Sequence, residues 1–141
     1  MANFNKHYAF VENVAEKVHN LQSDDLRVLL TNAAPTTANA IKSDLTEIGA
    51  GNGYTAGGTA ASQTSSAQSS GLYKLVCADV TFTASGGDVG PFEFADFYNN
   101  TPTAPSKPLI GWWDYGSAIT LHDTESFTVD FSAVNGVLTI Q

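Results

Sequence analysis

The first apolar pattern along the chain has the period of a helix. Apolar residues recur at spacings of three and four over residues 4–21, as one face of an amphipathic helix requires. These residues are Phe4, Tyr8, Val11, Val14, Ala15, Val18 and Leu21. The polar positions between them include Glu12, Glu16 and Lys17. The pattern predicts an N-terminal α-helix over about residues 4–21.

The rest of the chain has the period of β-strands. Residues 72–83 alternate between two sets of side chains, and residues 26–31 form a short run of branched apolar residues. Further strands are predicted over residues 92–98, 109–115, 118–121, 126–131 and 136–140. Turn residues separate them, and Asn135-Gly136 predicts a hairpin.

Roughly seven or eight strands after one helix are typical of a double-sheet β-fold. We expect one domain over residues 1–141, an antiparallel β-sandwich of jelly-roll type with one N-terminal α-helix.

Two segments have weaker patterns. A second short helix is possible over residues 36–47, although β-branched residues and Asn39 disfavour it. Residues 49–70 are rich in Gly, Ser and Thr and contain few large apolar side chains. Such a composition predicts a flexible loop or an extended arm, which we expect to become ordered against a neighbouring subunit.

The composition narrows the possible partners. Charged residues make up 14% of the chain, below the roughly 25% of an average globular domain. A sparsely charged surface suits a protein whose faces pack against neighbours, but a Thr- and Ser-rich β-protein without a partner would look the same. The formal net charge of −8 repels phosphate backbones and anionic lipid surfaces. We therefore expect no direct binding to nucleic acid or to membranes.

The chain offers few residues for covalent or metal chemistry. Cys77 is the only cysteine and lies in an apolar run, which predicts a buried thiol. The N-terminus lacks a signal-peptide hydrophobic region and no apolar stretch approaches a membrane span, so we expect synthesis in the cytoplasm. The histidines His7, His19 and His122 lack zinc-type spacing. The glycine-rich residues 49–54 depart from the nucleotide-binding G-x-G-x-x-G pattern. We predict no metal and no cofactor.

Candidate catalytic groups have simpler structural interpretations. His122, Asp123 and Ser126 suggest a hydrolase, but adjacent strand residues point to opposite faces and no nucleophile elbow is present. Glu93 and Asp96 suggest a glycosidase pair, but neighbouring carboxylates are common in an acidic protein. We expect no catalytic residues and no enzymatic activity.

Aromatic residues near the C-terminal third are candidate interface residues. Trp112, Trp113 and Tyr115 surround Asp114 and could form a sugar-stacking platform, although core or interface packing is the simpler reading. Because neighbouring strand residues face opposite ways, one tryptophan should enter the core while the other faces a partner or solvent. Together with Tyr54 these three aromatic residues form the candidate interface.

Four segments resemble a known family. They are YAFVENVAEKVHNL over residues 8–21, LTNAAP over residues 30–35, EIGAGNGY over residues 47–54 and PLIGWWDYG over residues 108–116. Together they resemble small virion proteins of tailed bacteriophages, and within that group the jelly-roll capsid cement (decoration) proteins.

The resemblance implies a non-enzymatic role in the virion. A cement protein binds the outer capsid surface, bridges major capsid protein subunits and stabilises the head, and the resemblance implies self-association as a homodimer. The alternative is a phage tail or receptor-binding module with a carbohydrate site, for which the aromatic residues around Asp114 would provide the surface.

Overall fold

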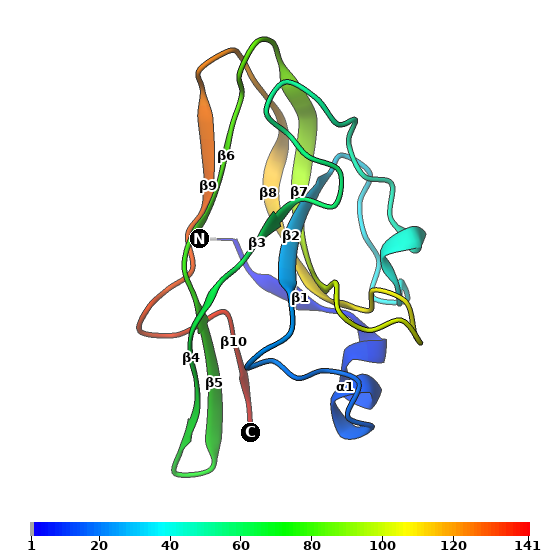
Figure 1. Ribbon diagram of the computed structural model, residues 1–141, viewed down its shortest axis with the longest axis vertical. Coiled ribbons are helices and arrows are strands. Elements are labelled where there is room, and N and C mark those ends of the chain that lie inside the picture. The colour runs from blue at the N-terminus through cyan, green and yellow to red at the C-terminus, as the bar shows by residue number, and fades with distance from the viewer. Residues whose placement is uncertain (1) are drawn as a thin grey trace.

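The computed structural model describes residues 2–141 as mainly antiparallel β-structure with one α-helix. This confirms the predicted fold class, while the jelly-roll connectivity stays a prediction. The strands form a five-stranded sheet, a three-stranded sheet and a two-stranded sheet. Figure 1 shows the two smaller sheets following one another along the length of the molecule.

The large sheet has the strand order β1-β8-β7-β2-β3. Its strands are β1 (Phe4–Lys6), β8 (Leu109–Leu121), β7 (Val89–Asn99), β2 (Leu26–Thr31) and β3 (Thr59–Ala60). The three-stranded sheet contains β10 (Leu138–Ile140), β5 (Leu72–Cys77) and β4 (Gln63–Ser69), in that order. The two-stranded sheet pairs β6 (Val80–Thr83) with β9 (Ser126–Val129).

The main core lies between the large sheet and the two smaller ones. It joins inward residues of β2, β7 and β8 to residues of the smaller sheets such as Leu75, Phe82 and Leu138. Strand β2 is buried on both faces, because Val28 contributes to this core while Leu29 packs with residues on the opposite face. Cys77 is buried in the main core, as predicted, and burial raises the pKa of its thiol to about 11.

The N-terminal helix is shorter than predicted. Residues 4–6 are strand β1, in which Asn5 pairs with Trp112, and α1 covers only Tyr8–Ala15. The apolar spacing continues past the helix end, but Lys17 has a left-handed backbone with a φ of 65°. Leu21 therefore reaches the core from a turn instead of from a helix, while Val18 is half-buried after the helix end. Helix α1 packs against β8.

The segments predicted as strands do form strands, but some of their bounds and pairings differ from the prediction. β2 has the predicted bounds, whereas residues 72–83 form two strands that belong to different sheets, and residues 109–121 form one strand. The hairpin predicted at Asn135-Gly136 is wrong, because β9 pairs with β6 and β10 pairs with β5. The turn, closed by a hydrogen bond from the Gly136 amide to the Ser132 carbonyl, redirects the chain between the two smaller sheets.

Residues 49–70 contain regular structure that their composition did not indicate. The second half holds β3 and the exposed strand β4, which forms a hairpin with β5. Its two-residue turn, Ser70-Gly71, has positive φ at both positions, the pattern of a tight hairpin turn. The helix considered over residues 36–47 is only the 3₁₀ turn Lys42–Asp44.

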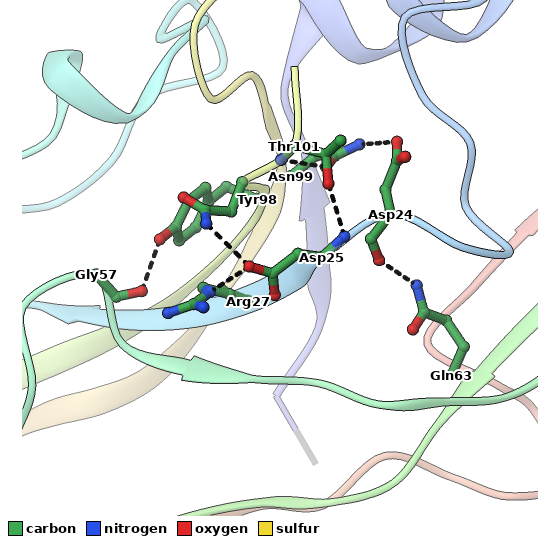
Figure 2. A network of polar contacts seen from close by, with 9 residues as sticks. Asp24, Asp25, Arg27, Gly57, Gln63, Tyr98, Asn99 and Thr101 are labelled. Carbon is green, nitrogen blue, oxygen red and sulfur yellow. Dashed lines mark hydrogen bonds and ion pairs between the residues drawn. The ribbon is translucent and has the colours of Figure 1, made fainter. Parts of the chain in front are cut away.

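A polar network ties the ends of several strands together (Figure 2). The Asn99 amide donates to Asp24 over 2.6 Å, and the Gln63 amide donates to the Asp24 carbonyl over 2.7 Å. Arg27 forms an ion pair with Asp25 over 2.8 Å. These contacts connect the start of β2 with the end of β7 and the start of β4.

Candidate binding cleft

A cavity of about 370 Å³ opens between the large sheet and the segment that runs from β9 into β10. Its lining comes from the N-terminus, β7, β8, β9 and the turn after β9. We call it the aromatic cleft, since Phe4, Phe92, Trp113, Tyr115, Phe127 and Phe131 line it.

The aromatic rings of the cleft meet at tilted and edge-to-face angles. The Trp113 ring lies 5.2 Å from Phe4 and 5.4 Å from Phe131, measured between ring centres. Phe127 packs edge-on against Tyr115 at 5.7 Å and against Phe92 at 5.1 Å. Each such pair contributes about 0.5–1.5 kcal/mol beyond simple burial, so the walls are held by mutual contacts.

The charged groups of the cleft are acidic. Glu93 and Asp130 line it, and among residues 2–141 no Lys, Arg or His side chain does. None of the ion pairs within the described chain involves either carboxylate. Among residues 2–141, the cleft therefore combines apolar ring surface with two carboxylates that no basic side chain pairs.

The two neighbouring tryptophans face opposite sides of the large sheet, as predicted. Trp113 packs with the core residues Phe97 and Phe131 and lines the cleft. Trp112 is only 8% exposed and contacts the His7 ring at 4.6 Å. Its assignment to an interface is therefore corrected, because the Trp112 side chain is buried and the His7 ring packs on it.

The other two candidate interface residues also have different positions. Tyr115 is 56% exposed at the mouth of the cleft, where a partner can contact it. Tyr54 is 3% exposed, which removes it from the candidate interface. Its hydroxyl donates to Glu47 over 2.8 Å and accepts from the Leu30 amide over 3.1 Å, and burial raises its pKa. Tyr54 therefore fixes the glycine-rich turn to β2.

The candidate catalytic groups are not assembled into a site. The His122 ring bonds to Asp88 over 3.0 Å on an exposed loop, which raises the pKa of His122. The Ser126 hydroxyl bonds to Thr83 on the neighbouring strand, and Asp123 accepts from the Gly86 amide. Within residues 2–141, no group of three His, Cys, Asp or Glu side chains is arranged to hold a metal ion.

The two carboxylates predicted as a possible pair are separated by the sheet. Glu93 lines the cleft, whereas Asp96 is fully buried beside Trp112 in the strand register. Asp96 accepts a hydrogen bond from the Thr31 hydroxyl over 2.9 Å, and its other oxygen has no partner among residues 2–141. Burial raises the pKa of Asp96 to about 7.

His7 is a second buried polar group that the sequence analysis missed. Its Nδ1 bonds to the Thr36 carbonyl over 3.0 Å, while Nε2 has no partner within the described chain. Burial lowers its pKa, and the bond to Thr36 opposes this shift. A histidine between a strand and a helix gives no periodic signal of burial, so only the tertiary contact with Trp112 identifies it.

Comparison with protein-family models, curated proteins and solved structures gives no match to this chain. None of the helices formed by residues 2–141 has the length and apolar character needed to span a membrane. Assignment of a function therefore depends on the residues themselves.

Proposed function

We propose that the protein is a capsid cement protein of a tailed bacteriophage, which binds the outer surface of the head and bridges major capsid protein subunits. The proposal starts from the family resemblance of residues 8–21, 30–35, 47–54 and 108–116. The structural observation that best supports it is a pair of separate surfaces suited to protein contacts. They are the aromatic cleft and the free edge of β4.

The free edge of β4 is suited to strand addition. β4 has a hydrogen-bonded neighbour on one side only, and its sequence QTSSAQS contains no charged residue and no proline. Natural edge strands usually carry such residues, because an unprotected edge pairs with other chains. A strand of a capsid subunit can add to this edge through main-chain hydrogen bonds.

Two surfaces on one small domain explain how cementing would work. Figure 1 shows the β4–β5 hairpin extending at one end of the molecule, so the edge of β4 reaches away from most of the chain. A domain that contacts two shell subunits binds fully only in the assembled lattice. It therefore stabilises the particle by mass action against loss of subunits.

The net charge of −8 fits a position on the outside of the shell. An acidic protein on the inner surface would face packaged DNA at close range, and screening over about 8 Å would not remove the repulsion. On the outer surface this repulsion is largely absent.

We further propose that the protein acts as a homodimer, which would place two copies of each binding surface on one bridge. Sedimentation equilibrium over a wide concentration range should give twice the chain mass of 14.9 kDa. A single species at the chain mass across that range would contradict the dimer.

The test of the cement function compares heads with and without the protein. We expect heads that lack it to release DNA at lower temperature and to resist chelator and osmotic shock less well, and re-addition of the purified protein should restore them. Equal robustness of both preparations, with loss of host adsorption, would instead favour the receptor-binding alternative.

A further inference from the structure

The aromatic cleft has the composition of a site for a cationic side chain. Its walls are aromatic rings, its formal charges are the carboxylates of Glu93 and Asp130, and among residues 2–141 no basic side chain lines it. A cation beside aromatic faces is attracted by the negative face of the ring, most strongly where water is excluded. Nearby carboxylates carry negative charge and therefore also attract the cation.

The ring arrangement disfavours a flat sugar ligand. Stacking of a pyranose needs one open aromatic face, but the Trp113 ring is contacted by Phe4, Phe97 and Phe131 at angles of 49°, 51° and 52°. Tyr115 is more exposed, yet it meets Phe127 at 83°. The rings form converging walls instead of a platform, and such walls enclose a narrow group.

Two free strand edges border the cleft. β1 and β9 each have one hydrogen-bonded neighbour, and both contribute lining residues, including Phe4 and Phe127. Edge strands of this kind have unpaired main-chain groups that can hold the backbone of an added peptide segment. The cavity of about 370 Å³ lies near the lower limit of ligand pockets, roughly 300–1,000 Å³, and suits one side chain with short flanks.

We propose that the aromatic cleft binds an arginine side chain presented by a partner protein. The planar guanidinium, smaller than a pyranose ring, stacks on the exposed Tyr115 ring between the walls of the cleft and donates hydrogen bonds to Glu93 and Asp130. Arginine fits better than lysine, because its weakly hydrated, planar cation both stacks on rings and bonds carboxylates. The inference rests on the proposed function in that the partner is a capsid subunit, and it specifies what that subunit presents.

The first experiment uses N-acetyl-arginine amide as the probe, with N-acetyl-citrulline amide as a neutral probe of the same shape. The two tryptophans provide an internal comparison, because Trp113 lines the cleft and Trp112 lies on the opposite face of the sheet. NMR titration should shift the Trp113 indole N–H signal and leave that of Trp112 in place. We expect the citrulline probe to bind at least fivefold more weakly.

Removing the charges should abolish this selectivity. The variant Glu93→Gln/Asp130→Asn should bind both probes equally, whereas the control Glu12→Gln/Glu16→Gln removes two exposed carboxylates elsewhere and should behave as the wild type. Equal shifts by both probes in the wild type, no shift of Trp113, or a shift caused only by glucose or N-acetylglucosamine would each overturn the arginine site.

A second experiment separates this inference from the proposed function. Purified variants are added to heads that lack the protein, and the bound fraction is measured by sedimentation. The charge-neutral variant should bind at least tenfold more weakly than the control variant. Equal binding of the two variants would overturn the arginine site and leave the cement function standing. Failure of the wild type to bind heads, with probe binding intact, would overturn the cement function alone.

Discussion

Asp96 is an ionisable residue whose burial has a cost that depends on pH. The residue is fully buried, one oxygen has no partner within residues 2–141, and burial raises its pKa to about 7. In the unfolded chain the pKa of an aspartate is about 3.9. The folded state therefore holds the proton more tightly, and the associated stability is present at low pH and is lost as the pH rises to about 7.

We predict that Asp96→Asn makes the protein more stable than the wild type at pH 8, by about 1–3 kcal/mol. The neutral amide avoids the buried charge, so the difference should shrink as the pH falls toward 4. Urea unfolding at a series of pH values measures it, with the exposed Asp114→Asn as control. A difference that is the same at every pH would show that Asp96 does not titrate as proposed.

His19 has the opposite pH dependence. Burial lowers its pKa to about 4, and its ring bonds to the Asn99 amide over 3.1 Å. A lowered folded-state pKa means that the contribution is present above the unfolded value of about 6.5 and is lost as the pH falls. We predict that His19→Gln loses less stability than the wild type between pH 6.5 and pH 4. Parallel unfolding curves for the two proteins over that range would contradict this.

At the residue scale, the sequence predicted which face of a strand a side chain points to better than it predicted which residues surround that side chain. Alternation along a strand correctly predicted that Trp112 and Trp113 face opposite sides. It could not predict that His7 covers Trp112, or that Tyr54 is buried, because these contacts depend on how distant segments fold together. Asp96 gave no signal of burial, since an acidic residue in a strand is normally placed in solvent.

At the element scale, Gly111 allows β1 to pair closely with β8. A side-chain carbon at this position would lie 2.3 Å from the Phe4 ring and 2.6 Å from the Asn5 carbonyl oxygen. We predict that Gly111→Ala displaces β1 and lowers the free energy of unfolding by about 1–3 kcal/mol. Gly49→Ala is the matched control, because that position has open space around it. Thermal unfolding measures both, and equal melting temperatures would contradict the prediction.

The free edge of β4 predicts a result for attachment to heads. Ala67→Glu places a charge on this edge, and Thr139→Glu places the same charge on β10, at the opposite edge of the same sheet. Both positions lie opposite Lys74 in the strand register, so local effects on stability should match. We expect only Ala67→Glu to weaken binding to heads, by about tenfold in a sedimentation assay, through loss of edge pairing. Equal binding of the two variants would show that β4 is not a contact.

Strands could be predicted from the sequence where they contain a run or an alternation of apolar residues. The run over residues 26–31 gave β2 with its bounds, whereas the polar strand β4 has no apolar alternation to reveal it. The helix was overextended because Phe4 and Leu21 continue its spacing from a strand and a turn. Asn135-Gly136 does form a turn, but which strands pair around it depends on contacts distant in sequence.

At the scale of the whole molecule, strand number was enough to predict a mainly antiparallel β-fold. The division into three sheets was not predictable, since β5 and β6 arise from one uninterrupted pattern. The aromatic cleft could not be predicted from the sequence either, because segments distant along the chain form its lining. These are the N-terminus, β7, β8, β9 and the turn after β9. The sequence did single out three of its residues as site candidates, which are Glu93, Trp113 and Tyr115.

The tight turn at Ser70-Gly71 also bears on protein engineering. Both residues are exposed, open space surrounds Gly71, and Figure 1 shows the hairpin tip reaching away from the other strands. Exposed loop tips of this kind are where chains tolerate insertions best. A foreign peptide inserted between Ser70 and Gly71 would leave the core and the aromatic cleft untouched. If the protein coats a particle in many copies, this tip is a natural place for the dense display of antigens.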